Sequence, residues 1–274
     1  TDQKDQKALI VPFEPKMYMS GIDKDLAVKT GMTFQQIRNN MRFGLSNVVL
    51  AEMHDKMSAV SLMHQDTGDV AKELSYIYSS IGYHYEEVPV EQLENIEPVK
   101  PGEDASTKDK VKYSLNKFAE KTKDKFNDIT HKDEKEEETK KSAGVVNGEV
   151  VTTYDNAERY MKTSIHNPNL LKELNAKFGA NVFIFINQLD IEKGADPDLK
   201  GLATDEYNRK IKVHYTMFDL NGKEISTGAC ISYFPNTTDD MNVIIKSHFA
   251  GIAKQMAARS VQEKEEEVAD DKKE

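Results

Sequence analysis

Residues 181–190 read Asn-Val-Phe-Ile-Phe-Ile-Asn-Gln-Leu-Asp, so apolar side chains occupy consecutive rather than alternate positions. Because successive side chains of a strand point to opposite faces, a strand of this kind has to be covered on both sides. That is typical of a central strand in a sheet that carries helices on its faces. The segment therefore predicts an α/β fold built around one buried strand.

The composition limits how much of the chain can form that core. Of the 274 residues, 31% are charged and 38% are hydrophobic, and the mean hydropathy is -0.65. A smaller core with long solvated segments fits these values better than one core that uses the whole chain. We predict an N-terminal part of the core at 1–95, a charged flexible insertion at 96–144, a C-terminal part of the core at 145–262 and a charged tail at 263–274.

Periodicity and turn residues predict the elements around the buried strand. The predicted strands are 7–13, 57–63, 83–89, a small hairpin at 145–151, and the hairpin arms 210–218 and 224–234. The predicted helices begin at Thr33, at Thr67 and near Asn236, and span 156–161 and 169–178, whereas residues 17–21 are predicted as a loop. Each half alone has too few strands to cover its helices, so we expect one shared sheet. The expected fold is α/β (α+β), with a mixed sheet flanked by amphipathic helices and interrupted by the insertion.

Charge and hydropathy argue against two classes of partner. The net charge of -10 opposes general nucleic-acid binding, which needs a basic face, and also opposes binding to anionic membranes. No stretch of the sequence approaches the roughly 18 apolar residues of a transmembrane helix. We therefore expect no nucleic acid, no transmembrane segment and no direct membrane binding.

Motifs that carry chemistry are not found in the sequence. None of the seven histidines lies in HxH or HExxH spacing, and no Gly-rich phosphate loop follows a predicted strand. Cys230, the only cysteine, lies in an apolar strand and is expected to be a buried, inert thiol. His214 is expected to be a packed or hydrogen-bonded neutral ring. We therefore expect no catalytic residue, cofactor or metal, and a non-enzymatic protein.

The beginning of the chain bears on its location. It starts at Thr1 with a short polar stretch that leads into a strand. We interpret this as a mature N-terminus after removal of a signal peptide, which predicts a periplasmic protein. A start trimmed for other reasons, in a cytoplasmic protein, is the alternative.

Two groups of apolar residues are candidates for binding a partner. Met17, Tyr18 and Met19 fall in the predicted loop, where an exposed apolar surface would dock a partner, although most methionines should fill the core. Val111, Leu115, Phe118 and Phe126 form a stripe at helical spacing among lysines, within a possible amphipathic helix at 108–129.

The stripe at 108–129 has three interpretations. It is a weakly formed solvated helix, a helix that docks into a groove of a partner, or a helix that lies on an anionic membrane. The acidic run 133–138 cancels the attraction to a membrane and weakens the third interpretation.

The C-terminal half carries a resemblance to known proteins. Its order is a helix, the strand segment KFGANVFIFINQLDI, the hairpin KVHYTMFDLNGKEISTG and an amphipathic helix. This order resembles the small periplasmic α/β domain of the TolB N-terminal domain, the penicillin-binding-protein activator lipoproteins and the curli-secretion lipoprotein family. The matching residues are Gly179-Ala180-Asn181 and the turn 219–224, and the resemblance covers about half of the chain. The long charged insertion and the lack of a lipidated cysteine at the N-terminus depart from that pattern.

The resemblance implies an envelope protein that binds other proteins and has no active site. We therefore expect an accessory or scaffold subunit of a bacterial periplasmic or outer-membrane complex. One alternative is a soluble enzyme or small-ligand-binding domain with a site at the strand ends, near Asn187, Asp190 and Tyr215. Another is a structural subunit whose insertion becomes ordered only at an interface.

Overall fold

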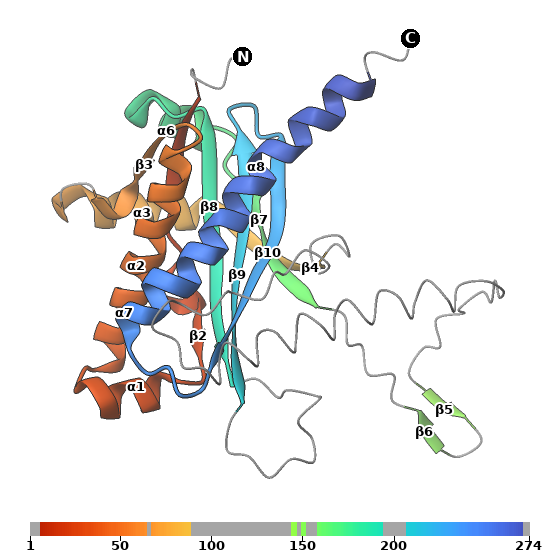
Figure 1. Ribbon diagram of the computed structural model, residues 1–274. Helices are drawn as coiled ribbons and strands as arrows, with labels where there is room; N and C mark the ends of the chain where they lie inside the picture. The colour runs from red at the N-terminus through yellow and green to blue at the C-terminus, as the bar shows by residue number, and fades with distance from the viewer. Residues whose placement is uncertain are drawn as a thin grey trace. The chain divides into compact units, whose positions relative to one another are not determined.

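A mixed sheet forms the centre of the protein (Figure 1). The computed structural model describes residues 6–64, 67–88, 144–146, 149–151, 158–193 and 207–270. The sheet is six-stranded and has the order β10-β9-β8-β1-β3, with β2 added beside the end of β8. Its strands are β1 (Lys7–Val11), β2 (Tyr18–Ser20), β3 (Ser58–Ser61), β8 (Val182–Glu192), β9 (Asn208–Asp219) and β10 (Glu224–Pro235).

The topology confirms that both halves of the chain build one sheet. β1 pairs in parallel with β3 and with β8, whereas β8–β9 and β9–β10 are antiparallel. The expected α/β class, the mixed sheet and the hairpin with arms near 210–218 and 224–234 are therefore all present, and the Gly222 N–H closes the hairpin turn on the Asp219 carbonyl.

The central strand β8 is buried along nearly its whole length, as its sequence predicts. A register shift against β9 falls between Ile186 and Gln188 and makes Asn187 an extra residue on the β8 side. Such a bulge reverses which alternate residues face each side. Ile184 and Ile186 before the bulge, and Leu189 and Ile191 after it, consequently all pack into the same core cluster.

One face of the sheet is covered by the long helices α2 (Phe34–His54) and α8 (Ala250–Asp270), with α1 (Asp23–Thr30) and the short α7 (Met241–Val243) beside them (Figure 1). α2 begins as predicted, because Thr33 and Gln36 form a reciprocal capping box. A π-helical segment, Ile244–Phe249, connects α7 to α8. The main core cluster joins the helices to this face through apolar residues that include Ile37, Met41, Leu45, Ile252 and Met256.

The opposite face carries two shorter helices and a two-stranded ribbon. The helices are α3 (Thr67–Ser79) and α6 (Leu170–Phe178), and the ribbon pairs β4 (Ile81–Glu87) with β7 (Arg159–Ile165) in antiparallel fashion. α6 ends as predicted at Gly179, which has a left-handed φ of 66°. Phe183 and Phe185 of β8 pack with Leu171, Leu174 and Ile77 in a second core cluster on this face.

Two predictions about local structure are wrong. Residues 156–161 were expected to be helical, but Arg159–Ile165 is strand β7, because β4 supplies a pairing partner that lies far away in the sequence. Residues 17–21 were expected to be a loop, but Tyr18–Ser20 forms the short strand β2, which pairs with β8. The helix α1 was not predicted, since Leu26 is the only residue of it that is buried.

Contacts divide the chain into a unit formed by residues 1–99 and 159–274 and a separate unit, residues 100–158. Within the second unit, β5 (Gly144–Val146) pairs with β6 (Glu149–Val151), which is the predicted small hairpin. In the part of the chain that the structure describes, no helix is both long and apolar enough to cross a membrane.

Candidate functional site

The edge of β7 rests on polar side chains of the central sheet. The Asn187 amide donates to the Met161 carbonyl (2.7 Å) and to Thr216 Oγ1 (2.9 Å), and its oxygen accepts from Thr163 Oγ1 (2.6 Å). The Thr163 N–H donates to Thr216 Oγ1 (3.1 Å). Backbone groups of a strand edge that would otherwise be unpaired in the interior are thus satisfied by side chains.

His214 completes this buried contact. Its Nδ1 accepts the Met161 N–H at 2.6 Å, so the proton is on Nε2, which donates to Asp190 Oδ2 at 2.9 Å. Burial lowers the pKa of His214 despite the nearby Asp190 carboxylate, which opposes that effect. The ring is therefore neutral and hydrogen-bonded, as expected from the sequence. Through these two hydrogen bonds His214 of β9 is joined to β7 and to β8. Because both ring nitrogens are already hydrogen-bonded, neither is free to contact a substrate.

The residues named for a strand-end site do not converge. Asn187 lies in the middle of β8, and Tyr215 faces the opposite side of the sheet, where its hydroxyl is 3.1 Å from Ser226 Oγ. Asp190 is buried and bonded to Gln188 and His214, so it is not a solvated strand end.

Cys230 is fully buried, and burial raises its pKa to about 12. Arg259 Nη1 lies 3.4 Å from the sulfur, but its favourable charge does not offset the desolvation of a thiolate. The thiol is held in its protonated form at neutral pH, so it has little nucleophilic character.

The first predicted partner-binding group is split between core and surface. Met17 and Tyr18 pack against the main core, and the Tyr18 hydroxyl donates to Asp23 Oδ1 at 2.7 Å. Met19 alone is clearly exposed, at 59%. The second group, Val111, Leu115, Phe118 and Phe126, lies outside the described residues.

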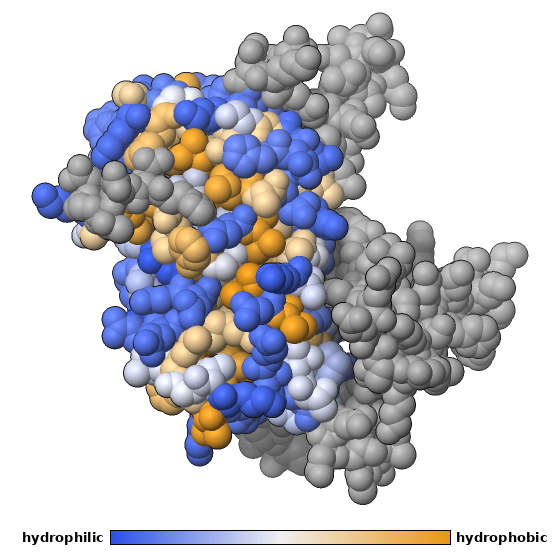
Figure 2. Space-filling model, turned by 60° about the vertical axis from the view of Figure 1, so that its left-hand side comes forward, coloured by the Kyte–Doolittle hydropathy of each residue, from blue (hydrophilic) through white to orange (hydrophobic). Residues whose placement is uncertain are grey.

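Met19 shares its end of the molecule with other exposed apolar residues. We call this region the α1–α7 surface and define it by Met19 on β2 (59% exposed), Val28 on α1 (83%), Phe34 at the start of α2 (59%) and Val243 on α7 (42%). A groove of about 550 Å³ lies between α1 and α7, lined by Lys29, Met32, Asp239, Asp240, Met241 and Val243 among others. In space-filling view, hydrophobic residues lie among polar ones on the side of the molecule that carries α1 and α2 (Figure 2).

The buried side chain of Arg209 holds together the elements that form the α1–α7 surface. The Arg209 guanidinium lies 3.3 Å from Asp25 of α1 and 3.1 Å from Asp239, and it donates to the Thr238 carbonyl at 3.0 Å. The side chain is almost fully buried over the Phe234 ring. It therefore ties α1 and the segment before α7 to β9, so the two walls of the groove are held in a fixed relation.

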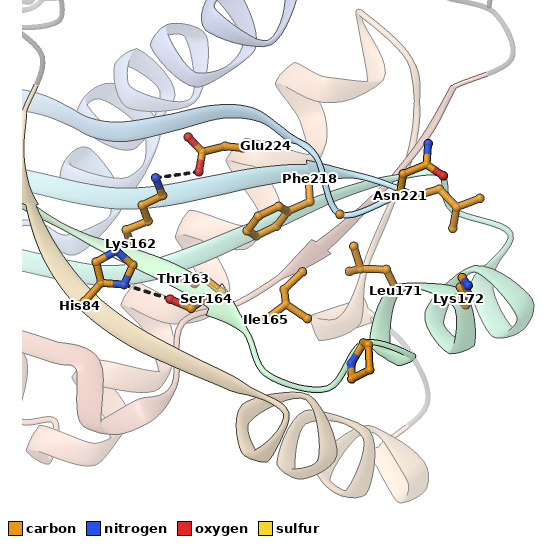
Figure 3. Close-up of a pocket in the computed structure, with 13 residues that line it drawn as sticks. His84, Lys162, Thr163, Ser164, Ile165, Leu171, Lys172, Phe218, Asn221 and Glu224 are labelled. Carbon is orange, nitrogen blue, oxygen red and sulfur yellow. Dashed lines mark hydrogen bonds and ion pairs between the residues drawn. The ribbon is translucent and has the colours of Figure 1, made fainter.

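A second cavity, of about 590 Å³, lies at the other end of β9 (Figure 3). His84 and Lys162 of the ribbon border it with Ser164, and the α6 region and the β9–β10 turn supply apolar walls that include Leu171 and Phe218. Ser164 Oγ lies 2.9 Å from His84 Nδ1, and His84 Nε2 lies 3.0 Å from Glu86 Oε1. Lys162 forms ion pairs with Glu86 (3.3 Å) and Glu224 (2.9 Å).

Sequence reasoning missed this cluster for a physical reason. His84 and Glu86 are two residues apart in a segment that was predicted to be extended, so their shared face was accessible from the sequence. Ser164 is 80 residues from His84 and lies in a strand that was partly predicted as helix, so nothing indicated that the two meet.

No group of three or more metal-ligating side chains is placed to hold an ion among the residues that the structure describes. No protein-family model matches the sequence, and no curated protein matches it either.

Proposed function

We propose that this chain is an accessory subunit of a bacterial cell-envelope complex and that it binds a partner protein through the α1–α7 surface. The observation that carries the proposal is the set of exposed apolar side chains, Met19, Val28, Phe34 and Val243, at one end of the sheet. Val243 lines the groove between α1 and α7, and the other three lie outside its lining. Exposed apolar side chains that lie together are typical of protein-binding surfaces.

The groove between α1 and α7 supports the choice of this end. Met32 and Met241 line it together with Val243, and flexible thioethers adapt to the shape of a bound apolar side chain. Asp239 and Asp240 lie on its rim, and the chain as a whole has a net charge of -10. Asp239 already pairs with Arg209 and Lys29, and Asp240 caps α7, so the partner segment that fits the groove is apolar.

The envelope location rests on the resemblance described above. The chain has the order α6–β8–β9–β10–α8, and it is on this order of elements that the resemblance depends. Those domains act by binding other proteins, which is the role proposed here for the α1–α7 surface.

The test compares a surface variant with a matched control. A C-terminally tagged protein is isolated from gently solubilised native membranes, as wild type, as Val28→Asp/Phe34→Ser and as Phe43→Ser. Phe43 is also an exposed aromatic residue of α2, but it lies nine positions further along the helix than Phe34.

We expect a stoichiometric partner with the wild type and with Phe43→Ser, and a loss of at least about tenfold with the double variant. Thermal melting of the purified proteins checks that the variants fold. Equal recovery of the partner with all three proteins, or a wild type that is always isolated alone, would refute the proposal.

A second candidate function is a soluble enzyme or small-ligand-binding domain. The observation that favours it is the cavity beside His84, which combines apolar walls with hydrogen-bonded polar groups. Its position differs from the strand-end site expected from the sequence.

A further inference from the structure

Three side chains on one face of the β4–β7 ribbon form a continuous hydrogen-bonded chain. His84 and Glu86 are two residues apart on β4, and Ser164 on β7 pairs with Gly82, so it lies diagonally across from His84. Glu86 Oε1 accepts the proton of His84 Nε2 at 3.0 Å, which leaves Nδ1 to accept the Ser164 hydroxyl at 2.9 Å. Nucleophile, base and carboxylate are therefore connected in the order that activates a serine.

The carboxylate is fixed by further contacts. Glu86 Oε2 accepts from the Tyr160 hydroxyl at 2.8 Å and lies 3.3 Å from Lys162 Nζ. Burial raises the pKa of Glu86, but its hydrogen bonds to His84, Tyr160 and Lys162 lower it by more, so that the net change is downward. An ionised, anchored carboxylate orients the imidazole and stabilises the imidazolium that forms when it takes up a proton.

Ser164 borders a cavity whose wall is partly apolar. His84 and Ser164 both line the cavity, and Figure 3 shows the imidazole directed at the Ser164 hydroxyl. The apolar part of its wall is formed by Ile165, Pro168, Leu171, Phe218 and Leu220. An apolar acyl chain can pack on this part of the wall, while the rest of the lining, which includes Lys172, Asn221 and Glu224, is polar.

We propose that Ser164, His84 and Glu86 form a hydrolytic site for esters or thioesters with an apolar acyl group. Ser164 Oγ attacks the acyl carbon while His84 takes the hydroxyl proton. Collapse of the tetrahedral intermediate breaks the bond to the alcohol or thiol, which leaves with the proton from His84. Water, deprotonated by His84, then attacks the acyl-serine, releases the carboxylic acid and restores the hydroxyl.

This activity is independent of the proposed partner binding. The cavity borders the β9–β10 turn, whereas the α1–α7 surface lies beyond the opposite ends of the same two strands. Changes at Val28 and Phe34 therefore should not affect hydrolysis, and changes at Ser164 should not affect recovery of a partner.

The test uses a fluorophosphonate probe, which reacts preferentially with an activated serine, and p-nitrophenyl butyrate as a substrate. We expect the probe to modify the wild-type protein, with mass spectrometry locating the adduct on Ser164. Ser164→Ala should abolish labelling and hydrolysis, and His84→Gln should lower the rate of hydrolysis by about 100-fold or more. Ser58→Ala, which alters an exposed serine on β3, is the matched control and should behave as the wild type.

The wild-type labelling result stands even if a variant fails to fold. A wild-type protein without an adduct, an adduct on another residue, or hydrolysis that persists unchanged in folded Ser164→Ala would overturn the proposal.

Discussion

His214 holds a strand that does not belong to its own sheet. Its two nitrogens bridge the Met161 N–H of β7 and the Asp190 carboxylate of β8, and the ring itself is fully buried. Removal of one partner from a buried hydrogen-bonded group leaves the other partners unpaired, which costs more than the bond itself contributes. His214 therefore contributes more to the free energy of unfolding than its two hydrogen bonds alone would.

We expect His214→Ala to lower the free energy of unfolding by about 2–4 kcal/mol, since it leaves the Met161 N–H without a partner, leaves Asp190 with only its bond from Gln188, and opens a cavity. Urea denaturation at pH 7.5 measures the change. His54→Ala, at an exposed position near the end of α2, is the control and should change stability by less than about 0.5 kcal/mol. Similar midpoints for the two variants would contradict this account of the contact.

His248 makes the stability of the protein depend on pH. It lies 8% exposed against the Phe234 ring, and burial lowers its pKa from 6.5 to about 4. The unfolded chain takes up a proton below about pH 6.5, but the folded state does so only near pH 4. Unfolding is therefore favoured as the pH falls through this window, and His248 alone accounts for about 3 kcal/mol lost by pH 4.

Urea titrations between pH 7.5 and 4.5 test this prediction. We expect His248→Gln, which has no titratable ring, to show a shallower loss of stability on acidification than the wild type. If His248 were not responsible for the loss of stability, the free energy of unfolding would fall with pH equally steeply in the wild type and the variant.

At the scale of elements, the close approach of α2 to the π-helical segment depends on a single glycine. A Cβ at Gly44 would lie 2.7 Å from Ile245 Cδ1 and 2.9 Å from both its Cγ atoms. Two of these atoms are the branches at Cβ, and a β-branched residue in a helix has one strongly preferred rotamer about its Cα–Cβ bond, so the side chain cannot easily turn away. The helices have to move apart if Gly44 is replaced.

We expect Gly44→Ala to destabilise the protein by about 1–3 kcal/mol, although alanine is the better helix former by about 1 kcal/mol. In the background of Ile245→Ala, the same substitution should become neutral or stabilising. A double-mutant cycle with thermal or urea unfolding measures this coupling. Additive effects would show that Ile245 is not the neighbour that limits the space at Gly44.

The elements also show what the sequence can and cannot predict. The apolar run of β8, the start of α2 at Thr33 and the hairpin of β9 and β10 depend on neighbouring residues, so they were predicted correctly. The strand β7 was partly predicted as a helix because its state is decided by pairing with β4, about 80 residues away. The Ser164–His84 contact depends on the same pairing, so the candidate site could not be recognised until the strands were placed.

At the scale of the whole molecule, residues 89–157 separate the two parts of the core in the sequence, but the strand ends on either side of them are neighbours in space. Glu87 pairs with Arg159, so the ends of β4 and β7 that flank residues 89–157 lie next to each other. The long intervening stretch therefore begins and ends at adjacent points of the ribbon, as a hairpin loop does.

We expect that replacing residues 89–157 with Asn-Gly, a pair that favours tight hairpin turns, leaves the core folded. The melting temperature should change by less than about 4 °C, which corresponds to about 1 kcal/mol. Circular dichroism and thermal melting of the shortened protein provide the measurement. A loss of cooperative unfolding would show that the core needs the replaced segment.

Side chains of α8 form hydrogen bonds with the edge strand β10. The Arg259 guanidinium donates to the Ala229 carbonyl at 2.7 Å, and the Gln255 amide donates to the Ile231 carbonyl at 3.0 Å. Bare carbonyls along an outer strand are a template on which a second chain can add and start a growing polymer. By occupying these two acceptors, the final helix makes this edge a poorer template, and we expect a chain cut short before α8 to aggregate.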